Sequence, residues 1–152
     1  MDTVKDLLDA KGHDVYSVKP NATVYEALEM MAEKNLGAVL VIDEKNAVKG
    51  IFSERDYARK IIIKGRASRT TRVKEIMTAK VLYVEPSTNV RDCMTLMTGK
   101  RIRHLPVMDG GNLVGVVSIG DVVKAHCSVQ ESVISQQEFR ISQLERYISG
   151  GV

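Results

Sequence analysis

The chain has 152 residues, of which 44% are hydrophobic and 27% are charged, and its formal net charge is +3 at pH 7. A chain of this length buries about two-thirds of its unfolded surface in one compact domain, so it needs neither a disulfide framework nor a structural metal to fold. The net charge is too small to indicate a nucleic-acid or anionic-membrane partner, but it does not exclude a small anionic ligand, which needs only local positive charge.

In chain order, the N-terminus comes first. The residues Met-Asp-Thr-Val-Lys lead directly into an amphipathic segment, without the apolar stretch of a secretory signal. No apolar run in the chain is long enough to span a bilayer. Because the two cysteines, Cys93 and Cys127, form no Cys-x-x-Cys pair, we predict a cytoplasmic protein with reduced thiols and no membrane partner.

The next predicted elements form a strand-helix-strand-strand-helix series. A short strand at 15–18 ends before Pro20, which cannot continue a sheet, and Thr23 has the position of a helix N-cap. Apolar runs at 38–42 and 48–52 are short enough for buried strands, and a polar turn joins them. A second helix then begins with the pattern Ser-x-x-Asp.

The second half of the chain repeats this series. When Pro20 is aligned with Pro86, five blocks match in the same order. We therefore predict an α/β (α+β) fold made of two β-α-β-β-α repeats, at residues 1–66 and 67–128. The matched blocks are 4–8 with 73–77, 18–20 with 84–86, 24–28 with 90–94, 39–43 with 105–109, and 50–56 with 115–121.

The last segment, 129–149, has no counterpart in the repeats and is predicted to be helical. Ile134, Ile141 and Ile148 are seven residues apart, and Leu144 lies between the last two. An apolar side chain at every seventh residue suits packing against a partner helix. The segment is therefore a candidate for a homodimer contact.

Two matched motifs, Ser53-Glu54-Arg55-Asp56 and Ser118-Ile119-Gly120-Asp121, lie where a strand runs into a helix. The free N–H groups and the dipole of a helix N-terminus attract an anion such as phosphate. The two oxygens of an aspartate can accept hydrogen bonds from the adjacent hydroxyls of a ribose. The same spacing is also that of a capping box, which only begins a helix. From the residues alone, both interpretations stay open.

At these motifs the chain resembles the CBS (cystathionine-β-synthase-type) family. The resemblance covers residues 3–127 and includes the duplication, the strand ending in Leu105-Pro106-Val107 and the Gly-h-h-Ser-x-x-Asp blocks, where h is apolar. The run 52–60 is similar to small stand-alone prokaryotic CBS-pair proteins. The resemblance implies two modules packed about a pseudo-twofold axis, with two clefts that bind an adenine nucleotide such as AMP, ATP or NAD(H).

The resemblance also implies which residues form the two clefts. In the first, Asp56 would hold the ribose, with the phosphates near Ser53 and Arg55 and the adenine near Ile51, Val81 and Leu82. In the second, Asp121 would hold the ribose, beside Ser118 and Gly120, with the adenine near Val15, Tyr16 and Val116. Both clefts would be lined near the axis by Gly37, Ala38, Arg103 and His104, of which Arg103 and His104 are candidate phosphate ligands.

The two copies differ in ways that predict unequal clefts. Glu54 and Arg55 stand where the second copy has Ile119 and Gly120, so charge borders only one cleft. His104 has a second interpretation, as a strand residue that bonds a backbone carbonyl.

The predicted function is a non-catalytic ligand sensor that passes its ligand state to a regulated protein and forms a homodimer. No nucleophile–base set and neither the Walker A nor the Rossmann glycine pattern occurs, so no catalytic residue or catalytic cofactor is predicted. His13 and His126 lack neighbours at metal-ligand spacing, so no metal is predicted. The alternatives are a ligand-free interaction or dimerisation module and, with less support, a polyanion binder that uses the basic segment 65–72.

Overall fold

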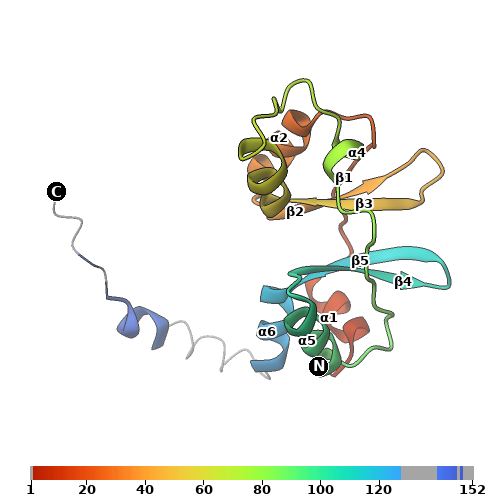
Figure 1. Cartoon of the computed structure of the whole chain (residues 1–152). Helices are drawn as coiled ribbons and strands as arrows, with labels where there is room; N and C mark the ends of the chain where they lie inside the picture. The colour runs from red at the N-terminus through yellow and green to blue at the C-terminus, as the bar shows by residue number, and fades with distance from the viewer. Residues whose placement is uncertain (1, 128–139, 147, 149–152) are drawn as a thin grey trace.

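The computed structural model describes residues 2–127, 140–146 and 148. They include two units of mixed α and β structure, stacked one above the other (Figure 1). The first unit contains β1 (Ser17–Val18), α2 (Val24–Lys34), β2 (Ala38–Ile42), β3 (Val48–Ser53), α3 (Glu54–Asp56) and the π-helix η1 (Tyr57–Ile62). The second contains α5 (Val90–Lys100), β4 (His104–Asp109), β5 (Asn112–Ser118) and α6 (Ile119–Cys127). The predicted α/β fold of two repeats is confirmed.

The two lead-in helices are exchanged between the units. Helix α1 (Val4–Lys11) lies beside α5 and α6, while α4 (Val73–Ile76) lies with the first unit (Figure 1). Leu8 is buried in the core of the second unit, and Val73 is buried in the core of the first. The Val73 amide donates to the Ala22 carbonyl at 2.8 Å. A unit in space therefore combines one repeat with the lead-in helix of the other, whereas the ranges 1–66 and 67–128 describe the repeats along the sequence.

The sheets of the two units face each other (Figure 1). In the first, β1 pairs in parallel with β2, and β2 pairs antiparallel with β3. In the second, β4 and β5 form an antiparallel pair, and residues 82–84, the counterpart in the second repeat of the strand predicted at 15–18, contribute only one parallel bridge from Val84 to Val107. Because side chains alternate along a strand, Val39 and Val41 enter the helix-covered core. Leu40, between them, is also buried and faces the opposite sheet.

The helix ends bring particular residues to the junction between the units. Thr23 Oγ1 accepts from the Glu26 amide at 3.1 Å, as predicted for an N-cap, whereas Asn89 accepts from the Arg91 amide at 2.7 Å. At their other ends, α2 and α5 stop at Asn35 and Arg101, which have left-handed backbones with φ of 57° and 56°. A left-handed residue turns the chain out of the helix, here directly into β2 and β4.

The glycine that begins each Gly-h-h-Ser-x-x-Asp block lies under an exchanged lead-in segment. A Cβ on Gly115 would lie 2.7 Å from Leu8 Cδ2, and a Cβ on Gly50 would lie 2.8 Å from the Thr78 carbonyl oxygen. Only a residue without a side chain lets the backbones approach this closely. Glycine at these two positions therefore lets the exchanged lead-in segments pack directly against the strands.

Most of the predicted C-terminal helix, including Ile134, lies outside the described residues. Residues 140–144 are helical, and Ile141, Leu144 and Ile148 are exposed by 57%, 65% and 97%. The homodimer contact predicted for this segment stays a prediction. None of the helices in the described part of the chain has the length and apolar character to cross a membrane.

Candidate functional site

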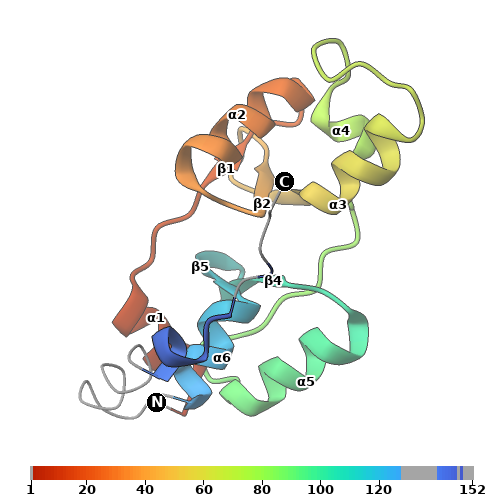
Figure 2. The same cartoon turned by 90° about the vertical axis from the view of Figure 1, so that its left-hand side faces the viewer.

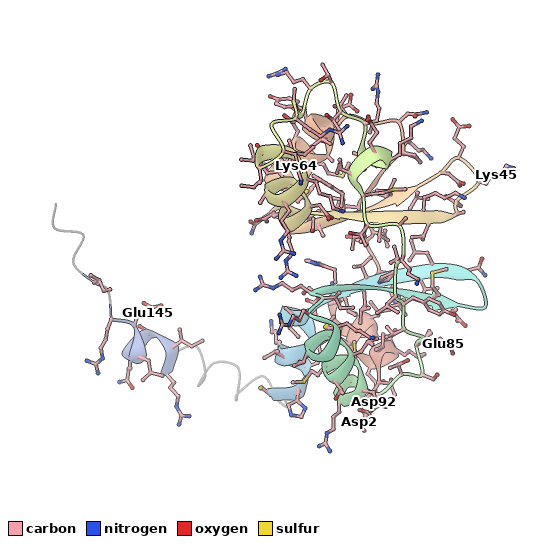
Figure 3. All side chains as sticks on the ribbon, viewed as in Figure 1. Asp2, Lys45, Lys64, Glu85, Asp92 and Glu145 are labelled. Carbon is pink, nitrogen blue, oxygen red and sulfur yellow. The ribbon has the colours of Figure 1, made fainter. Side chains whose placement is uncertain are left out.

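Two clefts lie between the units, beside the starts of α3 and α6, the helices labelled in Figure 2. The Asp56 cleft, of about 270 Å³, lies where β3 runs into α3, and the Asp121 cleft, of about 340 Å³, lies where β5 runs into α6. In Figure 3, Lys64 at the end of η1 marks this helical side, and Lys45 in the β2–β3 turn marks the opposite side. Both volumes are close to the lower end of those that hold small ligands, about 300–1,000 Å³.

The structure brings most of the predicted site residues together. The Asp56 cleft is lined by Gly37, Ala38, Ile51, Ser53, Arg55, Asp56, Arg103 and His104. The Asp121 cleft is lined by Tyr16, Gly37, Ala38, Ile51, His104, Val116, Ser118 and Asp121. Arg103 therefore lines one cleft and not both, whereas Ile51 lines both.

Four predicted residues lie elsewhere. Val15, Leu82 and Gly120 do not line either cleft. Val81 lines a third cavity of about 470 Å³ beside the turns at the strand ends, together with Ala79. Residues 79–83 lie between the β-bridges of Thr78 and Val84 and belong to no helix or strand, and neighbouring residues of a strand-like segment face opposite sides. Val81 therefore faces away from the Asp56 cleft.

Other residues that line the clefts were not predicted from the sequence. Lys11 and Asn35 line the Asp121 cleft, and Thr78 and Arg101 line the Asp56 cleft. Lys11 and Thr78 reach the clefts because the lead-in segments are exchanged. The alignment of the repeats contains a signal for the other two, since Asn35 and Arg101 occupy the same position in the two copies.

The carboxylate of Asp56 is fully occupied by protein groups. Its Oδ2 accepts from the amide and the hydroxyl of Ser53 at 3.0 and 3.1 Å. Its Oδ1 accepts from Thr78 Oγ1 at 3.2 Å and lies 3.0 Å from Lys60 Nζ. A carboxylate offers about four lone-pair sites, and Asp56, which is 7% exposed, has a donor for each. The motif is therefore a complete capping box whose carboxylate also forms a half-buried ion pair with Lys60.

The carboxylate of Asp121 is occupied on one side only. Oδ2 accepts from the Ser118 amide at 2.9 Å and from Lys11 Nζ at 2.6 Å, whereas neither bond uses Oδ1. Burial acts to raise the pKa of Asp121, but the hydrogen bonds from Lys11 and Ser118 and the charge of Lys11 outweigh it and hold the pKa below its ordinary value. This side chain is 27% exposed, so an ionised oxygen is accessible from the cleft.

His104 lies in the wall that the two clefts share, and its ring is close to Gly37: a Cβ there would lie 3.4 Å from His104 Cε1. Burial lowers the pKa of His104, and the charges of Arg103 and Lys11 act in the same direction, while Asp121 and Glu54 oppose them. Among the hydrogen bonds of the described residues, none joins this ring to a backbone carbonyl, unlike the ring of His13, which lies 2.9 Å from the Val114 oxygen. His104 therefore presents a neutral ring to both clefts at neutral pH.

Comparisons with known proteins agree with this architecture. The model of the CBS domain matches residues 4–63 and 73–127. The mitochondrial CBS domain-containing protein CBSX3 of Arabidopsis thaliana is 40% identical over 157 residues, which cover 98% of this chain and 73% of the relative. A solved structure of a CBS-domain protein from Burkholderia ambifaria MC40-6 is 50% identical with a TM-score of 0.79, over 97% of this chain and 99% of that one.

A more distant structure shares the fold. The CBS domain pair of protein MJ0100 is 24% identical with a TM-score of 0.72, over 82% of this chain and 94% of that one. That domain pair was crystallised with 5′-methylthioadenosine and S-adenosyl-L-methionine.

Proposed function

This chain belongs to the CBS-domain family, and from this premise we propose that it binds an adenine nucleotide and reports its presence to a regulated protein without catalysing a reaction. The site that supports the proposal best is the Asp121 cleft.

The observation that carries the proposal is Asp121 Oδ1, which accepts none of the hydrogen bonds formed among the described residues. Its two lone pairs match the two adjacent hydroxyls of a ribose, and hydrogen bonds to a charged group contribute about 1.5–3 kcal/mol each. Two small residues, Gly37 and Ala38, line the same cleft. The adenine ring has an aromatic neighbour in Tyr16, which is 37% exposed and lies 5.6 Å from Lys34 Nζ.

The ligand we expect is anionic. Lys11 Nζ donates to Asp121 Oδ2 and to the Val116 carbonyl oxygen, so its third N–H can donate to a phosphate oxygen, a bond that the cationic sulfonium of S-adenosylmethionine cannot accept. AMP, ATP and NAD(H) share the adenosyl group and carry phosphates. The adenosyl ligands of the MJ0100 domain pair support an adenosine site in this fold. They carry no phosphate, so the expected preference for a phosphate is argued from the residues of this chain alone.

A ligand in the Asp121 cleft contacts both units, because Asp121 and Ser118 belong to the second unit, and Tyr16, Gly37 and Ala38 line the cleft from the first. The ligand shifts the arrangement of the units only if it binds one arrangement better. We propose that a protein partner reads this arrangement in the cytoplasm, and that the C-terminal segment 129–149 holds a homodimer together.

Thermal unfolding with a ligand panel tests the proposal. We expect AMP, ADP, ATP, NAD or NADH at a hundred times its dissociation constant to stabilise the protein by about 2.7 kcal/mol, which raises the melting temperature by roughly 5–10 °C for a chain of this size. Asp121→Asn keeps one acceptor for Ser118 but removes the charge, and it should abolish the shift. Asp92→Asn, on the exposed start of α5, is the matched control and should keep it.

The outcomes separate the candidate functions. If no member of the panel shifts the melting temperature, the chain is a ligand-free interaction or dimerisation module. A shift that survives Asp121→Asn places the nucleotide in another site and contradicts the proposal. Nucleotide turnover that Asp56→Ala or Asp121→Ala abolishes would instead show an enzyme.

A further inference from the structure

The Asp56 cleft has a chemistry of its own, which the nucleotide proposal does not use. Each lone pair of Asp56 already has a donor from Ser53, Thr78 or Lys60, so no oxygen is left for a ribose. The Lys60 charge also cancels the Asp56 charge, so the carboxylate does not repel an anion. This cleft is therefore built for something other than a nucleoside.

Three arginines line the same cleft without acidic partners. Arg55, Arg101 and Arg103 all border it and are exposed, and none forms an ion pair with an acid in the described part of the chain. Arg55 Nη1 donates to the Arg101 carbonyl oxygen at 3.2 Å, which fixes one guanidinium across the boundary between the units. Of the two acids that line this cleft, Asp56 is paired with Lys60, and Glu54 is the other.

The comparison between the copies shows that this charge is specific to one cleft. The positions equivalent to Arg55, Arg101 and Arg103 in the other copy hold Gly120, Asn35 and Gly37. All three exchanges replace an arginine by a small neutral residue around Asp121. The cleft with the free carboxylate oxygen thus has no arginine, and the cleft with the occupied carboxylate has three.

We propose that the Asp56 cleft binds an oligophosphate, a chain of two or more phosphates, without a ribose contact. Planar guanidinium groups form paired hydrogen bonds with phosphate oxygens, and three of them converge on a cavity of about 270 Å³. His104, Gly37, Ala38 and Ile51 line both clefts, so the phosphates can come from two sources. They are either a free inorganic oligophosphate or, if the proposed function holds, the phosphate tail of a nucleotide seated at Asp121.

Calorimetric titration with inorganic tripolyphosphate, adenosine and ATP tests the proposal. The variant is Arg103→Gln, because the Arg103 side chain makes no hydrogen bond within the described residues and its loss leaves the fold intact. The control is Arg59→Gln, an exposed arginine of η1 that lines neither cleft. We expect Arg103→Gln to weaken tripolyphosphate binding at least tenfold, to leave adenosine binding unchanged, and Arg59→Gln to change neither.

The titrations also identify the source of the phosphates. Tripolyphosphate binding that depends on Arg103 supports a free oligophosphate. If tripolyphosphate does not bind but ATP binds more tightly than adenosine, and Arg103→Gln removes the difference, the phosphates are a nucleotide tail. If Arg103→Gln changes neither ligand, the proposal is overturned. Loss of adenosine binding alone, with tripolyphosphate retained, would remove the proposed function and leave this site standing.

Discussion

Lys60→Ala tests whether Asp56 is kept from a ribose by its own neighbours. Alanine is the residue that the second repeat has at the equivalent position, Ala125, so the change makes the first copy more like the second. The variant removes the Nζ–Oδ1 contact of 3.0 Å and the bond from Lys60 to the Ile76 carbonyl at 2.9 Å. It frees one lone pair of Oδ1, while Thr78 keeps the other.

The cost in stability can be worked out from the exposure of the pair. Removing one partner of a fully buried ion pair costs about 3–5 kcal/mol. The Asp56 side chain is 10% exposed, but that of Lys60 is 41% exposed, and Asp56 keeps its bonds from Thr78 and Ser53. Solvent screening and the remaining donors reduce the expected loss to about 1–2 kcal/mol, which lowers the melting temperature by roughly 2–8 °C.

Thermal unfolding measures the loss of stability, and calorimetric titration with adenosine measures the additional adenosine binding. The wild-type chain should bind one adenosine, at Asp121, and the Lys60→Ala chain should bind a second one more weakly, at Asp56. Lys64→Ala, an exposed lysine beyond the end of η1 (Figure 3), is the control and should change neither quantity. Two equal adenosine sites in the wild-type chain would refute the reasoning, as would an unchanged melting temperature for Lys60→Ala.

Three further predictions follow from the described contacts. Gly115→Ala should cost about 1–3 kcal/mol in thermal unfolding because its Cβ meets Leu8, whereas Gly99→Ala, with open space around its Cβ, should stabilise α5 by up to about 1 kcal/mol. Because burial lowers the pKa of His104, its imidazole binds a proton more tightly in the unfolded chain than in the folded chain. The free energy of unfolding should therefore fall as the pH drops below about 6.5, and urea titrations of His104→Asn should show a shallower fall. Lys11→Met should weaken AMP relative to adenosine by roughly three- to tenfold in calorimetry, which equals about 1 kcal/mol, and an equal loss for both ligands would contradict a phosphate contact.

Local patterns predicted the elements well because short-range physics sets them. The strand at 38–42 has the bounds that its apolar run predicted, and Thr23 is the N-cap that its spacing predicted. The exception is 82–84, which has apolar residues but pairs only at Val84. Its neighbours, Leu82 and Tyr83, stay exposed, because the residues on either side of Val84 do not pair with the sheet.

The contents of the clefts were only partly predictable. Alignment of the two copies found Asp56 and Asp121, but the exchange of α1 and α4 between the units is a long-range feature that no local pattern encodes. The sequence therefore did not predict that Lys11 and Thr78 line the clefts. The side to which the Val81 side chain points depends on the register of residues 79–83, and a shift of one residue would turn this side chain to the opposite side.

The Ser-x-x-Asp motif had two interpretations from the sequence, and the structure gives both a physical basis. A capping box and a ribose contact compete for the same carboxylate oxygens, so the outcome depends on how many other donors reach them. At Asp56, Thr78 and Lys60 complete the set; at Asp121, the donors Lys11 and Ser118 converge on one oxygen and leave the other. Thr78 and Lys11 both come from exchanged lead-in segments. With these donors in place, both oxygens of Asp56 but only one oxygen of Asp121 accept hydrogen bonds, and we propose that this difference decides which cleft holds a nucleoside.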